Sequence, residues 1–160
     1  NVTVTLTNGN YKGDVFNGTG YYTQLGDCLD VYIGEGATLT GAISLTQTRH
    51  VDENGDQNTY FTINEYYYLG HVKNKNYRNN HSLVGVTLKD GGVWKVTGES
   101  LISSLMVEEG TIAGEKGNAV VMTVDGNETL IEQGVSYEGD IVIMPVKADN
   151  NKHHKSHNKH

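Results

Sequence analysis

The region from Val86 to Ile112 contains the same short pattern twice. The first copy reads Val86-Thr-Leu88-Lys-Asp-Gly91-Gly-Val-Trp94, and the second reads Leu105-Met-Val107-Glu-Glu-Gly110-Thr-Ile112. In each copy, two apolar residues separated by one residue are followed by an acidic residue, a glycine and a further apolar residue. The alternation is typical of a strand with one buried face, and the glycine is typical of a turn. Each copy therefore predicts a strand, a tight turn and a return of the chain to the core.

The strand unit recurs along the chain. Six copies are present: Val4-Thr-Leu6, Val31-Tyr-Ile33, Val86-Thr-Leu88, Leu105-Met-Val107, Met122-Thr-Val124 and Ile141-Val-Ile143. The second apolar residues of successive copies are 27, 55, 19, 17 and 19 residues apart. Three nearly equal steps predict a repeating coil of about 19 residues, and the long step predicts one coil plus an insertion of roughly 36 residues. We expect the insertion at 46–82, where the composition changes.

A repeat this short, without helical periodicity, is typical of a β-solenoid, because one coil cannot bury its apolar face alone. We therefore expect an all-β fold, a single-stranded parallel β-helix with successive strands about 4.8 Å apart. An antiparallel β-sandwich is the alternative, because it also joins many short strands by turn residues. We expect Ile141-Val-Ile-Met144 to close the C-terminal end, and Pro145 to end the ladder. The pair Trp94-Lys-Val96 predicts that Trp94 lies in the core.

The charge balance restricts the class of partner. The chain has 160 residues, with 12 Lys and Arg against 19 Asp and Glu, and a formal net charge of −7. Without the last fourteen residues, 8 basic and 18 acidic groups remain, which is a net charge of −10. A body this acidic repels phosphate backbones, so we expect no nucleic-acid partner. The longest apolar run, Ala119 to Met122, is far shorter than the ~18 residues that cross a bilayer, so we expect no membrane insertion.

We expect one domain over residues 1–146 and a disordered tail over 147–160. The tail is rich in His, Lys and Asn and has no apolar periodicity. The tail contains four histidines, His153, His154, His157 and His160. They can chelate Zn²⁺ or Ni²⁺ adventitiously, without the fixed geometry of a metal site. The single cysteine, Cys28, excludes an internal disulfide. Because Asn1 begins inside an apolar alternation, we expect the domain to be a fragment of a larger protein, flanked by further β-helix coils.

Two stretches of the sequence resemble a known group of proteins. They are Tyr60-Phe-Thr-Ile-Asn-Glu-Tyr66-Tyr-Tyr-Leu-Gly-His71-Val72 and Val93-Trp-Lys-Val-Thr-Gly-Glu-Ser100. They resemble a segment of bacterial secreted and cell-surface proteins, the adhesin-like or autotransporter-like right-handed β-helix domains of the broad pectin-lyase-like class. The resemblance implies a right-handed β-helix and an extracellular or cell-surface location. It brings no established catalytic motif.

The insertion concentrates residue types that suit sugar binding. It holds five of the ten tyrosines, both arginines and all three histidines outside the tail. Aromatic faces stack on the C–H faces of sugar rings, and polar side chains bind the hydroxyl groups. We expect ligand contacts from Tyr66, Tyr67, Tyr68, His71, Tyr77 and Arg78. The alternative is that Tyr66 and Tyr68 pack the insertion against the solenoid.

Support for catalysis is weaker. Enzymes that cleave polysaccharides on this fold use paired carboxylates or acids with a basic residue, and pairs such as Asp27/Asp30 and Glu108/Glu109 are present. With two arginines and no dense acidic cluster, we expect no catalytic residue and no cofactor. The sequence favours a non-enzymatic, adhesin-like surface module that binds glycans or a host surface through the insertion. The alternatives are a polysaccharide lyase or hydrolase fragment and a structural stalk without a ligand.

Overall fold

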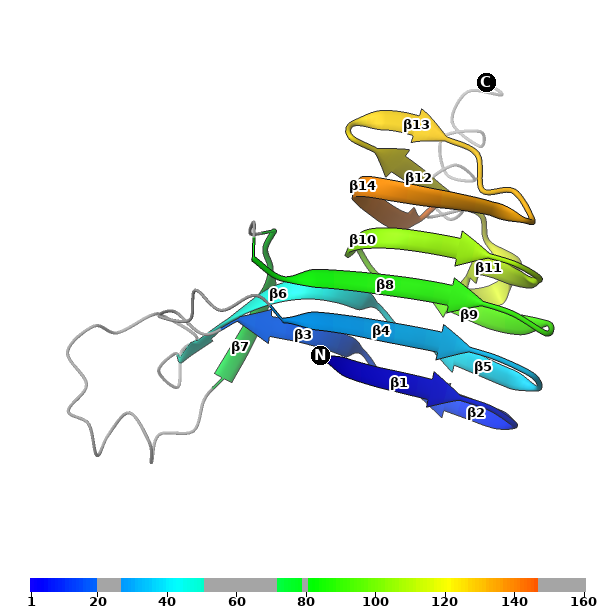
Figure 1. The fold of residues 1–160 in the computed structure, drawn as a ribbon, viewed down its shortest axis with the longest axis horizontal. Helices are drawn as coiled ribbons and strands as arrows, with labels where there is room; N and C mark the ends of the chain where they lie inside the picture. Colours follow the sequence, from blue (N-terminus) through cyan, green and yellow to red (C-terminus); the bar gives the residue numbers. More distant parts are fainter. Residues whose placement is uncertain (20–26, 51–71, 79–80, 147–160) are drawn as a thin grey trace, which may run out of the picture.

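The computed structural model describes residues 1–19, 27–50, 72–78 and 81–146. These residues form strands in several sheets, with one short 3-10 turn, Glu115–Gly117. The expected all-β class is confirmed. The chain passes repeatedly from a first sheet to a second and a third, and Figure 1 shows these turns of chain lying one above another.

The first sheet begins with four parallel strands: β1 (Val2–Leu6), β4 (Cys28–Ile33), β8 (Leu83–Leu88) and β10 (Ser100–Val107). In this ladder Leu6 lies opposite Ile33, Ile33 opposite Leu88, and Leu88 opposite Val107. The paired residues are 27, 55 and 19 positions apart, which are the first three steps predicted from the repeated unit. The sequence repeat is therefore the register of the sheet.

The other two sheets repeat this order. The second contains β2 (Gly9–Lys12), β5 (Ala37–Thr40), β9 (Gly92–Val96) and β11 (Gly110–Gly114), all paired in parallel. In the third, β3 (Val15–Thr19) pairs in parallel with β6 (Ile43–His50), and β7 (Val72–Asn76) pairs antiparallel with β6. The expected insertion therefore leaves the stack along β6 and returns to it along β7.

The predicted acidic-glycine turns connect the first sheet to the second and stack on one another. The Gly34 N–H donates to Leu6 O, Lys89 N–H to Ile33 O and Glu108 N–H to Leu88 O, at 2.9, 3.1 and 2.9 Å. Gly36 and Gly91 occupy equivalent places in their turns, with φ of +67° and +80°. Glycine is favoured there because a side chain is rarely accommodated at positive φ.

The inward residues of the stacked strands form one core. Val31, Val86 and Leu105 make one continuous column, and Ile33, Leu88 and Val107 make the next. Trp94 is fully buried in the second sheet, as predicted, and its indole N–H donates to Gly41 O at 2.9 Å. Burial of a polar donor costs little when it has an acceptor, so the tryptophan is accommodated without an unpaired N–H.

The last two copies of the repeated unit are not further coils. They lie in β12 (Val120–Val124) and β14 (Val135–Pro145), which pair antiparallel, as does β13 (Asn127–Thr129) with β12. The cause is the two-residue turn Asp125-Gly126, in which both residues have positive φ, 50° and 84°. This turn matches the twist of a hairpin and reverses the chain. Antiparallel strands of this kind are what the sandwich alternative predicts, whereas the parallel ladders are what the coil hypothesis predicts.

Strand β14 closes the ladder at its C-terminal end. It pairs antiparallel with β10, and Ile141 and Ile143 are fully buried. Pro145 is the last residue of β14 and lies opposite Val120. The stretch 141–144 therefore lies in the strand that covers the open edge of β10, but the sheet does not end there, because β12 and β13 extend it beyond β14.

Replacing Leu88 by alanine tests the central column. Leu88 is fully buried between Ile33 and Val107, so we expect Leu88→Ala to lower the free energy of unfolding by about 2–5 kcal/mol. The control is Thr87→Ala, a half-buried position on the opposite face of the same strand, with an expected loss below about 1 kcal/mol. Urea unfolding followed by circular dichroism measures both values. Equal losses would contradict the proposed inward direction of Leu88.

Candidate functional site

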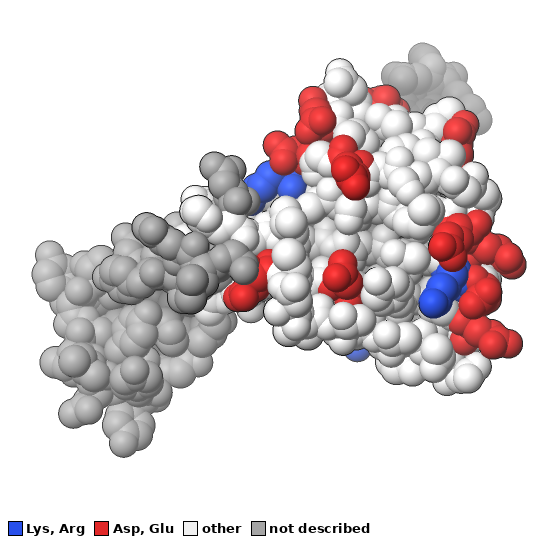
Figure 2. Space-filling model, viewed as in Figure 1, with Lys and Arg blue, Asp and Glu red and all other residues white. Residues whose placement is uncertain are grey.

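The outer face of the first sheet contains a hollow of about 880 Å³. It lies over β4, β8, β10 and β14, on the side of the molecule that faces the viewer in Figure 1. Figure 2, drawn from the same direction, shows separate acidic groups on this face over a largely uncharged surface. Residues from all four strands line the hollow, as does the chain that returns from the insertion, so the pairing of these strands in one sheet builds the site.

A row of four residues crosses the hollow from strand to strand. Asp30 lies opposite Gly85, Gly85 opposite Ser104, and Ser104 opposite Glu138. Adjacent strands are about 4.8 Å apart, so the row spans roughly 14 Å between the outermost Cα atoms. It presents a carboxylate, a gap, a hydroxyl and a second carboxylate along one line.

Gly85 forms the gap in this row. A Cβ atom on Gly85 would stand 2.8 Å from both Asp30 Oδ1 and Ser104 Oγ. The side chains of both neighbours therefore lean over the glycine and occupy the space that a side chain would need. The φ of Gly85 is not in the left-handed region, so this glycine is needed for space on the outer face rather than for backbone conformation.

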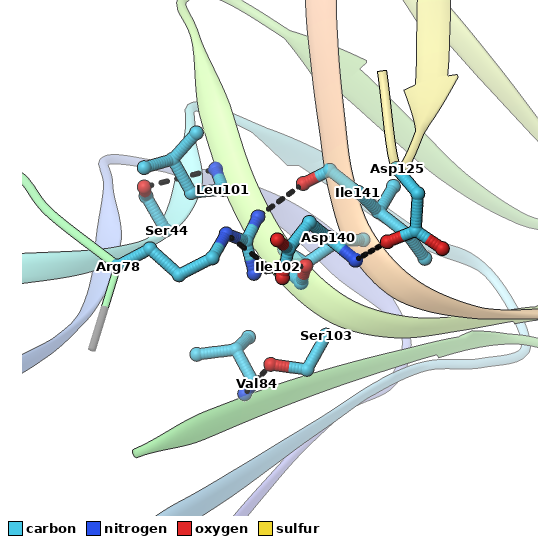
Figure 3. Close-up of polar contacts among 9 residues, drawn as sticks. All are labelled: Ser44, Arg78, Val84, Leu101, Ile102, Ser103, Asp125, Asp140 and Ile141. Atoms are coloured by element: carbon cyan, nitrogen blue, oxygen red, sulfur yellow. Dashed lines mark hydrogen bonds and ion pairs between the residues drawn. The ribbon is translucent and has the colours of Figure 1, made fainter. Parts of the chain in front are cut away.

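Arg78 borders the hollow at the base of the insertion. Its Nη1 donates to Ile102 O at 3.0 Å and its Nη2 donates to Ile141 O at 2.8 Å (Figure 3). Its Nε is 3.5 Å from Asp140 Oδ1. The guanidinium therefore joins β10 to β14, using the planar donor arrangement that distinguishes arginine from lysine. All three nitrogen atoms face groups of the protein itself.

The contacts of Arg78 lie beside a bulge between β10 and β14. Pairing is regular as far as Ile102 opposite Ile141 and resumes at Ser104 opposite Glu138, so two residues of β14 oppose one of β10. Gly139 takes a φ of +131°, and Asp125 supports the bulge by accepting a hydrogen bond from Asp140 N–H at 2.9 Å. The bulge interrupts the regular hydrogen bonding locally and bends the strand. The Arg78 contacts stabilise the site at this irregular point.

Removal of Arg78 tests its role as a clamp. We expect Arg78→Ala to lower the free energy of unfolding by about 1–3 kcal/mol, because two carbonyl groups lose a charged donor. The ion pair adds little to this loss, since the Asp140 side chain is 69% exposed. Arg78→Lys keeps the charge but not the paired donors, so we expect a smaller but measurable loss. Denaturant unfolding of the three proteins checks the order, and wild-type stability in Arg78→Ala would contradict the clamp.

The structure places the residues predicted to bind ligand in different situations. Tyr66, Tyr67, Tyr68 and His71 lie outside the described residues, as do the tail histidines. Tyr77 is 46% exposed and is outside the hollow, whereas Arg78 lines it. The two were predicted to act together, but the donors of Arg78 bind the backbone and Asp140.

The carboxylate pairs suggested by the sequence also lie in different places relative to the hollow. Asp30 lines the hollow, while Asp27 is exposed and does not line it. Glu108 and Glu109 are exposed in a turn between the first and second sheets. The carboxylates that share the hollow are Asp30, Glu138 and Asp140, a combination that the sequence pairs did not include.

Three residues of the row share one signal in the sequence. Asp30, Gly85 and Ser104 each stand three residues before the second apolar residue of their unit, which are Ile33, Leu88 and Val107. Aligning the units by that residue would have brought all three together. Glu138 has no such signal, because β14 is antiparallel and its register depends on the bulge.

The hollow has the chemistry of a polar binding site. Carboxylates and hydroxyls accept or donate hydrogen bonds, and Leu83, 51% exposed, adds an apolar surface at the hollow. Arg78 is the one Lys or Arg side chain among the described lining residues, and Asp140 offsets its charge. Within the described parts of the chain, no group of three or more His, Cys, Asp or Glu residues is arranged to hold a metal ion.

Comparisons of the chain with protein-family models, with curated proteins and with solved structures gave no match. Over the residues that the structure describes, no helix has the length and apolar character required to span a membrane. The hollow and the parallel ladders beneath it are therefore the features from which a function can be inferred.

Proposed function

We propose that the chain is an adhesin-like segment of a right-handed parallel β-helix, displayed outside the cell, and that it binds carbohydrate without cleaving it. The parallel register at intervals of 27, 55 and 19 residues supports the coil assignment. The right-handed sense is favoured because crossover connections between parallel strands are right-handed in nearly all proteins. The proposed ligand site is the hollow over Gly85, at the base of the insertion.

The row Asp30, Gly85 and Ser104 carries the proposal. Its carboxylate and hydroxyl lean from both sides over a position without a side chain, so their oxygen atoms lie close together on the outer face and can hydrogen-bond the same ligand. Sugar hydroxyl groups suit such pairs of acceptors and donors. A stack of coils also provides a rigid, extended face, which reduces the entropy lost when a chain-like ligand binds.

The charges of the hollow favour neutral or amino sugars over acidic ones. Asp30 and Glu138 supply negative charge, and the positive charge of Arg78 is held by Asp140 and two carbonyl groups. A uronate or sialate carboxylate would therefore meet repulsion without a free guanidinium. An ammonium group on an amino sugar would be attracted by either carboxylate.

Filling the gap in the row tests the site. We expect Gly85→Ala to remain folded, because the atoms it displaces belong to the ends of two side chains, and to reduce glycan binding at least tenfold. Gly98→Ala is the matched control, since a Cβ there meets nothing within 4 Å and its φ is ordinary. Both variants and the wild-type chain are applied to an array of neutral, amino and acidic glycans. Equal binding by the three proteins would exclude the hollow as the site.

Cys28 offers a second readout at the same place. It is the single cysteine of the chain, it lines the hollow, and it is partly exposed. A bound glycan is expected to slow alkylation of its thiol in the wild-type chain, in proportion to occupancy. A Tyr66→Ala/Tyr67→Ala/Tyr68→Ala variant separates the hollow from the insertion. Binding that is lost in this variant while Cys28 stays unprotected would assign the ligand to the insertion instead.

The two remaining functions are outcomes of the same experiment. Retaining and inverting glycosidases use two carboxylates about 5–9.5 Å apart, and the hollow contains the carboxylates of Asp30, Glu138 and Asp140. We rank cleavage below binding, and shortened glycan products would reverse that order. Failure of every glycan to bind or to protect Cys28 would favour a stalk without a ligand.

A further inference from the structure

The loop from Leu130 to Gly134 lies against the last turn of the parallel ladders. It joins β13 to β14, and Figure 1 shows it beside the connection from β10 to β11. Gln133 contacts the first residue of β11. Its Nε2 donates to Gly110 O at 2.6 Å, and its Oε1 accepts from Gly110 N–H at 3.0 Å. Among the described strands, β11 is the last one of the second sheet at this end, so the contact lies on a sheet edge.

These two hydrogen bonds use the groups that a further strand would need. Successive residues of a strand direct their backbone groups to opposite sides. Glu109 O accepts from Gly91 N–H, on the side of β9, so the backbone groups of Gly110 point to the side where the sheet ends. A glutamine amide has one carbonyl acceptor and N–H donors, as a peptide group has. Gln133 therefore occupies both groups of Gly110 in the way that an added strand would.

The backbone of the same loop repeats a contact found in each earlier turn. In the first sheet, the carbonyl groups of Leu6, Ile33 and Leu88 each accept a hydrogen bond from the turn that follows the next strand. Val107 is the fourth residue of this column, and its carbonyl group accepts from Gly134 N–H at 2.6 Å. Gly134 therefore makes the bond that the turn of a fifth parallel strand would make.

Three further contacts hold the loop in this position. The Tyr137 hydroxyl donates to Leu130 O at 2.8 Å and accepts from Glu132 N–H at 2.9 Å. Between these two residues, Ile131 is half-buried and packs against the core. The loop therefore presents an inward apolar side chain and edge hydrogen bonds, as a strand of the ladder does, although it is not itself a strand.

We propose that residues 130–134 are a plug that keeps other strands off the last turn of the ladders, and that Gln133 is the contact that closes β11. The strand reads Gly-Thr-Ile-Ala-Gly, without a charge or a proline. Edge strands that stay unpaired usually carry charges, prolines or bulges, or are covered by a loop. At the other end of β11, Gly114 N–H donates to Asn118 O at 2.7 Å. Covering, rather than charge, therefore protects this edge.

Opening the plug should let a second copy of this chain pair with β11. Two copies of this uncharged strand can pair antiparallel about Ile112, its middle residue, and a twofold contact of this kind closes at the dimer. None of the residues of the plug lines the hollow, so this association does not depend on the proposed ligand. It can therefore be tested apart from the proposed function.

Two variants open the plug in steps. Gln133→Ala removes both bonds to Gly110, and Gln133→Ala/Tyr137→Phe also releases Leu130 and Glu132 while keeping the aromatic ring. Sedimentation with a chelator, which removes metal from the tail histidines, should give an association constant about tenfold above wild type for Gln133→Ala, and higher for the double variant. Hydrogen exchange locates the contact. The Gly110 amide should exchange about tenfold faster in dilute Gln133→Ala and regain protection on association.

Glu132→Ala is the matched control. Glu132 uses its backbone N–H in the plug and its side chain is exposed, so this variant should associate no more than wild type. Folded Gln133 variants that associate no more than wild type, or an unchanged exchange rate at Gly110, would overturn the proposal. Association without renewed protection of Gly110 would also overturn it, because the contact would then lie elsewhere. Circular dichroism reports folding, and Gln133→Ala alone decides the test if the double variant unfolds.

Discussion

The structure depends on one constraint, the register of the parallel strands in the first sheet. Leu6, Ile33, Leu88 and Val107 must lie opposite one another, because a shift of one residue would turn every inward side chain to the solvent. Fixing this register also fixes the turns, since each acidic-glycine turn donates a backbone hydrogen bond to the end of the previous coil. The burial of Trp94 in the next sheet follows from the same alignment. The insertion is tolerated because it leaves and returns through β6 and β7, outside the ladder.

The register that buries the inner face of the first sheet also determines which residues lie side by side on its outer face. Residues three positions before each aligned apolar residue point outward, and they bring Asp30, Gly85 and Ser104 into one row although 55 and 19 residues separate them in sequence. No single segment of the chain contains the site. A substitution such as Gly85→Ala can therefore alter the outer face while leaving the column of Val31, Val86 and Leu105 intact. The core lies on one face of these strands and the proposed binding site on the other, so stability and the proposed binding can vary separately.

The sequence predicted the parts of the fold that follow the repeated unit, and it missed the places where the repeat is interrupted. The spacing of the apolar pairs anticipated three steps of the ladder, and the inward alternation anticipated Trp94. The final steps of 17 and 19 residues looked the same, yet Asp125-Gly126 turns the chain back; that dipeptide is a strong hairpin signal that the regular spacing obscured. Arg78 was identified as a ligand contact from its residue type, but its donors join β10 and β14 across a bulge. A bulge depends on how two distant strands pair. The local sequence pattern therefore could not predict the hydrogen-bond partners of Arg78 or the position of Glu138 in the row.

The reversal of chain direction at β14 also gives the stack a polarity. A parallel ladder can continue in either direction, since each new coil presents the same edges as the last. The antiparallel strands end that growth on one side, and Asp125, Asp140 and Arg78 hold the junction between the two kinds of pairing. Among the described strands, β1 lies at the other end of this sheet and carries alternating valine and threonine. The repeating register is therefore broken at β14, where the hairpin turn and the bulge replace a further parallel strand by strands that run in the opposite direction.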